Sequence, residues 1–157
     1  MSSNKKRLAA IIAGVGTWAA ALYGALAISQ FHGDWGHGVC GPWGCGPPAQ
    51  ALVSCHLFWV VLLVLPLCLV SAHSTTASLR RIGLGLLLGG VFGLFAVAVW
   101  QAVVWLPAVQ GWSRSYFLQR YLFTLATLVE APIAQISLAG AVLWRIARLR
   151  QDKPTAY

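Results

Sequence analysis

The sequence predicts an all-α integral membrane protein in which four transmembrane helices form one bundle. Four apolar stretches carry this prediction, each near the roughly 20 residues that a helix needs to cross a bilayer. These stretches have almost no polar stripe of the kind that a soluble helix turns toward water. With 59% hydrophobic and 9% charged residues, the chain leaves little room for a soluble domain. We therefore expect a single domain over residues 1–157, with spans at residues 8–29, 51–71, 82–106 and 121–144 and an external loop at residues 30–50.

The first span, residues 8–29, follows a basic run at residues 5–7. A cleaved secretory signal has the same pattern, and the Ala-Leu-Ala sequence at residues 25–27 offers a small-residue cleavage site. However, the apolar run exceeds the roughly 7–15 residues that are usual in a signal, and it contains the bulky Trp18 and Tyr23. We therefore expect a retained membrane anchor.

The other three spans contain residues that shape a helix or its packing. Pro66 in the second span and Pro132 in the fourth each lack a backbone donor, which predicts a kink in both helices. The third span carries Gly85, Gly89 and Gly93 at four-residue spacing, so all three lie on one helical face. Because small residues let membrane helices approach closely, this face predicts packing within the chain, with self-association as the alternative.

The distribution of charge predicts the orientation of these spans. The net charge is +8, and the basic residues gather before the first span, before the third span and after the fourth. The only basic residues in the other two connections are Arg114 and Arg120. The positive-inside rule then predicts that both termini lie in the cytoplasm. We expect a bacterial-type inner membrane, with the lipid bilayer as the first partner, although the rule would serve a protein of the endoplasmic reticulum equally well. This distribution supplies no surface of interleaved basic and aromatic residues, so we do not expect nucleic-acid binding.

The external loop holds a pair of cysteines, Cys40 and Cys45, which enclose a Gly-Pro-Trp-Gly turn. Because the expected compartment is oxidising, a structural disulfide is the first interpretation. In a second interpretation, His32 and His37 join the two cysteines in a four-ligand site for zinc or copper. In a third, the pair is redox-active and exchanges electrons with a substrate thiol or a quinone. Cys55, about one turn inside the second span, would extend the pair to a three-cysteine relay.

Four polar side chains inside the spans are the remaining candidates, namely His56, Gln101, Glu130 and Gln135. An acid within a span is costly and is a functional candidate by default. Counted from the outer ends of the spans, His56 and Gln101 lie about 8 Å deep and Glu130 about 14 Å deep, so Glu130 is expected within reach of either one. The alternative is that protonated Glu130 hydrogen-bonds a neighbouring helix as part of the packing.

These observations favour a non-catalytic accessory or assembly subunit of a larger membrane complex. Its partners would be other membrane subunits or further copies of the chain, and the external loop would be the partner surface. One alternative is a thiol-redox or metal-handling protein that uses the Cys and His side chains of the loop. Another is a transporter or channel subunit in which Glu130 and Gln101 line a polar path. The sequence identifies no cofactor, and its three acidic residues supply no complete catalytic set.

Overall fold

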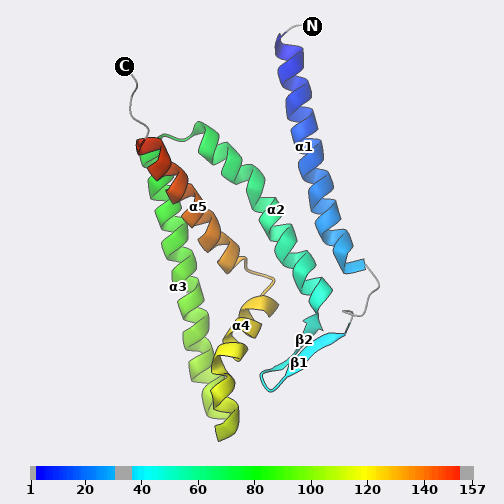
Figure 1. The fold of residues 1–157 in the computed structure, drawn as a ribbon, viewed down its shortest axis with the longest axis vertical. Coiled ribbons are helices and arrows are strands. Elements are labelled where there is room, and N and C mark those ends of the chain that lie inside the picture. The colour runs from blue at the N-terminus through cyan, green and yellow to red at the C-terminus, as the bar shows by residue number, and fades with distance from the viewer. Residues whose placement is uncertain (1–2, 31–36, 153–157) are drawn as a thin grey trace.

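Three long helices run along the molecule, and two shorter helices complete it (Figure 1). The structure is a computed structural model that describes residues 3–30 and 37–152. Its long helices are apolar enough to cross a membrane, as expected of an all-α membrane protein. The elements are α1 (Ser3–Ala27), the 3-10 helix η1 (Ile28–Gln30), β1 (Gly38–Gly41), β2 (Gly44–Pro48), α2 (Ala49–His73), α3 (Thr76–Ala108), the 3-10 helix η3 (Gly111–Tyr116), α4 (Phe117–Thr127) and α5 (Ile133–Gln151).

The fourth predicted span, residues 121–144, is not one helix. Helix α4 ends at Thr127 and α5 begins at Ile133, so five residues without helical structure separate them. Pro132 occupies the N-cap of α5, a place where its missing N–H and restricted φ disturb no helical hydrogen bond. The kink expected at Pro132 is therefore a complete break. Among the described residues, three helices rather than four have the length and composition of a membrane span.

The start of α1, the turn between α2 and α3, and the end of α5 all lie at the same end of the molecule (Figure 1). Helices α1, α2 and α3 alternate in direction, and α4 and α5 together run back along α3. The β-hairpin, η3 and α4 lie toward the opposite end. The fold thus gathers most of the basic side chains at one end, namely Lys5, Lys6, Arg7, Arg80, Arg81, Arg145, Arg148 and Arg150.

Helices α3 and α5 make the closest helix contact in the fold, and glycines allow it. A Cβ added to Gly83 would lie 2.6 Å from the backbone nitrogen of Trp144. A Cβ added to Gly140 would lie 2.7 Å from the backbone oxygen of Gly83. Neither distance is sterically tolerable, so both helices require glycine where they cross. Beside this crossing, Leu79, Leu143 and Ala147 form the buried core.

The predicted glycine face of α3 is only partly used within the chain. A Cβ on Gly93 would lie 2.9 Å from Cγ2 of Ile133, whereas one on Gly85 or Gly89 would meet no described atom within 4 Å. Helix α5 instead packs on the face that carries Gly83, which lies about 200° around the helix from Gly85. The expectation of packing within the chain is therefore wrong for Gly85 and Gly89.

We expect Gly140→Ala to lower the free energy of unfolding by about 1–3 kcal/mol, because overpacking a close contact costs this much. Gly85→Ala is the matched control, since its Cβ meets open space. That control should not destabilise the protein, because alanine in a helix interior is favoured over glycine by about 0.5–1 kcal/mol. Equilibrium unfolding in detergent micelles measures both variants, and equal losses would contradict the crossing described above.

Candidate functional site

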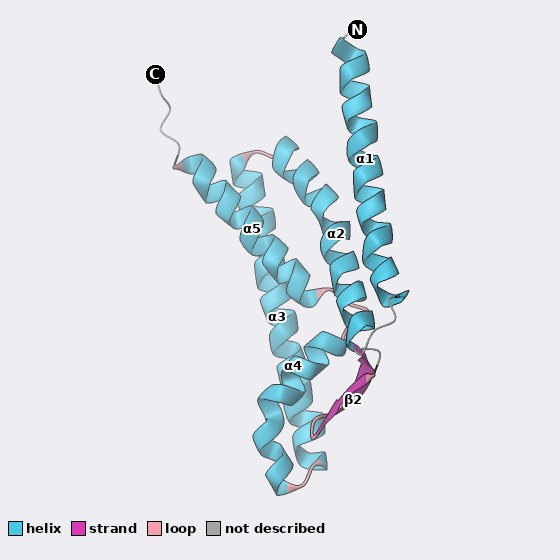
Figure 2. Cartoon of the chain, turned by 45° about the vertical axis from the view of Figure 1, so that its right-hand side comes forward, coloured by secondary structure: helices cyan, strands magenta, loops and turns pink. Residues whose placement is uncertain are grey.

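The break between α4 and α5 lies roughly midway along the molecule (Figure 2). The apolar part of α5, from Ile133 to Trp144, is about 18 Å long. The hydrocarbon core of a bilayer is roughly 30 Å thick. If the membrane surface lies where the basic residues begin after Trp144, the break falls inside the bilayer. Irregular backbone at that depth is tolerated only where other protein groups or a water-filled cavity satisfy it.

Two side chains of α2 bind the carbonyl groups exposed by the break. The indole Nε1 of Trp59 donates a hydrogen bond to the carbonyl of Val129 at 2.7 Å. The Nε2 of His56 lies 2.8 Å from the carbonyl of Ala126, one of the last residues of α4. Carbonyls at a helix end have no partner within the helix, so these bonds replace the missing ones. The three-residue spacing of His56 and Trp59 puts both side chains on the same face of α2.

The second ring nitrogen of His56 contacts Gln135, in the first turn of α5. The amide Nε2 of Gln135 lies 2.7 Å from Nδ1 of His56. With the amide in this orientation, Nδ1 accepts a hydrogen bond and Nε2 donates one to Ala126, so a single tautomer satisfies both nitrogens. His56 therefore connects α2 to both sides of the break. It also brings together two of the polar residues identified from the sequence.

Glu130 lies in the break itself, and its side chain is exposed. The hydrogen bonds of His56 go to Ala126 and Gln135, and Gln101 bonds to Arg120. The expected contact of Glu130 with His56 or Gln101 is thus not formed in the described structure. Glu130 comes three residues before α5, where the positive end of a helix dipole favours a negative charge.

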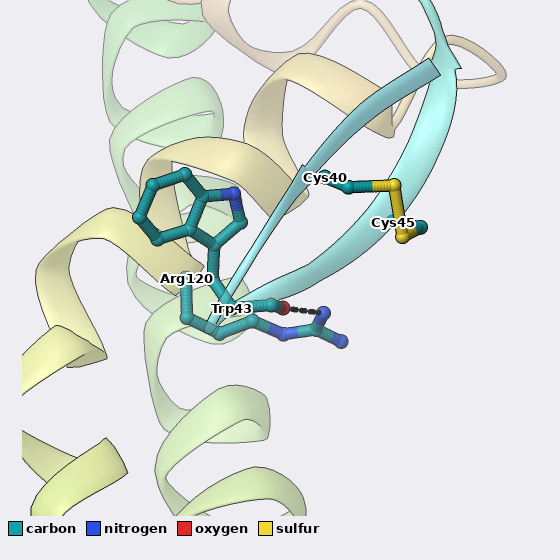
Figure 3. Close-up of a disulfide and its surroundings, with 4 residues drawn as sticks. All are labelled: Cys40, Trp43, Cys45 and Arg120. Atoms are coloured by element: carbon teal, nitrogen blue, oxygen red, sulfur yellow. Dashed lines mark hydrogen bonds between the residues drawn. A yellow bond between two sulfur atoms is a disulfide. The ribbon is translucent and has the colours of Figure 1, made fainter.

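Gln101 belongs to a second polar site, which joins the external hairpin to the helices. Its side chain is 5% exposed, and its Oε1 accepts a hydrogen bond from Nε of Arg120 at 3.1 Å. The same guanidinium donates through Nη1 to the carbonyl of Trp43 at 2.6 Å (Figure 3). The Trp43 ring packs against Tyr116, with 6.2 Å between centroids. Arg120 thus ties the turn of the hairpin to α3 and α4.

Sequence reasoning did not single out Arg120. The available signal was its position, as one of two basic residues in the connections with few charges. The positive-inside rule already uses the position of a basic residue in these connections, so the position alone does not indicate a hydrogen-bond contact. Its hydrogen-bond partners come from segments 19 and 77 residues away in the chain, so no local pattern reveals them.

The hairpin is stapled by a disulfide between Cys40 and Cys45, which face each other across β1 and β2 (Figure 3). Gly44 in its turn has a φ of +121°, a conformation that favours glycine. A Cβ on Gly46 would lie 2.7 Å from Cζ of Phe123, so glycine lets α4 pack directly on β2. The structure confirms the disulfide expected from the sequence.

The four-ligand metal hypothesis does not fit the disulfide-bonded form of the hairpin. A zinc or copper site would need thiolates, and both sulfurs are joined to each other. His37 is exposed next to β1, and His32 lies outside the described residues. Across residues 3–30 and 37–152, no group of three or more His, Cys, Asp or Glu side chains gathers. Cys55 is free and half-buried on α2.

Comparison of the chain with protein-family models, curated proteins and solved structures finds no match. The chemistry of the two sites therefore follows from their geometry. Every buried side-chain nitrogen and oxygen in the described part of the chain has a hydrogen-bond partner. Both polar sites thus hold backbone in place, at the broken helix in one case and at the hairpin in the other.

We expect Trp59→Phe to destabilise the protein by about 1–3 kcal/mol, the cost of leaving an interior carbonyl without its partner. Amide hydrogen exchange should accelerate at the end of α4 and the start of α5, because the Val129 carbonyl loses its donor. Trp100→Phe is the control, since that side chain is 65% exposed on α3. Unchanged exchange at the break in Trp59→Phe would show that the indole does not support it.

Proposed function

We propose that this protein is a non-catalytic accessory or assembly subunit of a larger membrane complex, with the external hairpin as its partner surface. The observation that carries the proposal is the way in which the hairpin is held. The Cys40–Cys45 disulfide, the Arg120 contacts and the packing of Gly46 on Phe123 hold it at three places. A surface that is already ordered before a partner binds loses less conformational entropy on binding.

The hairpin suits contact with another protein, because Val39, Pro42 and Pro47 are all exposed on it. Trp112 lies nearby in the aromatic cluster and is 63% exposed, with its ring centroid 6.2 Å from that of Tyr116. Exposed aromatic side chains are enriched among the residues that contribute most to protein interfaces.

The free face of α3 supports the proposal from within the membrane. Gly85 and Gly89 leave room for close approach by a helix from outside the chain. Phe92 follows on the same stretch of α3 and is 72% exposed. Small residues with open space beside them are typical of contacts between membrane helices.

The proposed topology has both termini in the cytoplasm of a bacterial-type inner membrane. Helices α1, α2 and α3 would be three crossings, and α4 with α5 would be a fourth, broken crossing. The basic end of the fold supports this orientation, because basic residues are retained on the cytoplasmic side. An exposed disulfide also suits the oxidising external compartment.

Native mass spectrometry of the protein, extracted gently from its own membrane, tests the proposal. We expect co-purifying subunits with the wild-type chain, and their loss in Arg120→Ala, which removes the link between the Trp43 carbonyl of the hairpin and Gln101 of α3. Arg114→Ala is the matched control, because it removes an exposed charge from the same end of the molecule. A wild-type chain that is recovered alone, as a monomer, would refute the proposal.

A second candidate function is thiol–disulfide exchange at the external hairpin. Both Cys40 and Cys45 are exposed, so a thiolate of another protein has access to either sulfur. Thiol trapping in intact cells separates the two functions. A structural disulfide stays fully oxidised, whereas a working pair gives a mixture of reduced and oxidised chains that shifts when the growth medium becomes reducing.

A further inference from the structure

An apolar groove runs between α2 and α5. Near the basic end it has a volume of about 500 Å³, with Leu67 and Cys68 on one wall and Val142 and Ile146 on the other. A narrower section of about 110 Å³ continues it toward the break. Val64 lines both sections, so the two form one path.

The end of the groove away from the break is polar. Arg150, in the last turn of α5, reaches α2 and donates through Nη2 to the carbonyl of Ser71 at 2.8 Å and to its hydroxyl at 3.2 Å. Both bonds use one nitrogen, so the hydrogens on Nε and Nη1 have no acceptor among the residues that the structure describes. A guanidinium has five donors in a planar fork, a geometry that suits two oxygens of one phosphate.

The length of the groove matches one leaflet of a bilayer. The wall contributed by α2 extends from Val60 to Ala72, which is about 18 Å along a helix. Half of the hydrocarbon core is about 15 Å. A chain that starts at Arg150 and follows the groove would therefore end near the middle of the membrane, next to the break.

The positive charge around Arg150 favours lipids with an anionic headgroup over neutral ones. Arg145 and Arg148 lie on the same two turns of α5, and Arg80 and Arg81 lie in the second turn of α3, which starts at the same end of the fold. Asp152 is the one described acid on these segments, so positive charge prevails. The guanidinium of Arg148 lies over the Trp144 ring, 4.5 Å from its centroid. Arg150 is the arginine that lines the groove.

We infer that this groove binds an anionic glycerophospholipid of the leaflet at the basic end. Its phosphate accepts hydrogen bonds from Arg150, and one acyl chain lies along Leu67, Val64 and Val142. Apolar walls accept any acyl chain, and the guanidinium adds the preference for a negative headgroup. This site is separate from the proposed partner surface, so failure of either one leaves the other standing.

The test uses the full-length protein, freed of lipid in detergent and titrated with phosphatidylglycerol or with phosphatidylcholine of the same acyl chains. Native mass spectrometry counts the bound lipids. We expect phosphatidylglycerol to bind the wild-type chain about fivefold more tightly, equal to about 1 kcal/mol. Arg150→Ala should remove this preference. Arg148→Ala changes the net charge equally and should change the affinity for either lipid by less than about twofold.

A second pair of variants tests the groove without altering charge. Val64→Trp places a large side chain inside the groove and should weaken binding of both lipids several-fold. Val99→Trp is the matched control, because Val64 and Val99 are 47% and 44% exposed on different helices. Circular dichroism checks that all four variants keep their helices.

Three results of these binding measurements would overturn the inference. These are equal binding of the two lipids to the wild-type chain, equal effects of Arg148→Ala and Arg150→Ala, and unchanged binding in Val64→Trp. A photocrosslinker at position 64 that captures a polypeptide in native membranes, rather than lipid, would also overturn it.

Discussion

A helix that is interrupted inside a bilayer must satisfy its free backbone groups with protein, because the hydrocarbon offers them no hydrogen bonds. In the proposed topology the break lies inside the bilayer, and α2 meets that requirement. Trp59 binds the carbonyl of Val129, and His56 contacts both Ala126 and Gln135. These contacts hold α4 and α5 against α2 at the depth where the chain is least regular. The position of both shorter helices depends on them.

The glycine crossing and the arginine contacts complete the arrangement on either side of the break. On the basic side, Gly83 and Gly140 let α3 and α5 pack with their backbones in close contact. On the hairpin side, Arg120 connects α4 to Gln101 of α3 and to Trp43 of the hairpin. Each half of the broken segment thus has its own attachment to α3. The break between them can remain irregular without separating the two halves.

The polar side chains at the break and at the hairpin hold backbone in place, and the exposed surfaces offer two different kinds of contact. The disulfide-stapled hairpin presents a rigid surface at one end, which supports the proposed role as a subunit of a membrane complex. At the other end, Arg150 closes an apolar groove whose length matches one leaflet. A subunit that binds a protein at one face and an anionic lipid at the other would position its partner relative to the basic side of the membrane.

Hydropathy and local chemistry by themselves predicted the class of this protein and its three long helices, and they made the Cys40–Cys45 disulfide the first of three interpretations. These features are local, since an apolar run of sufficient length or two cysteines across a short turn need no distant partner. Tertiary structure decided the rest. Pro132 predicted a kink, but the extent of the break depends on donors that α2 supplies from 70 residues away. Likewise, the face of α3 that packs is decided by where α5 crosses it. A spacing of four residues between Gly85 and Gly89 describes a face of the helix, and only the neighbouring helix determines whether that face is covered.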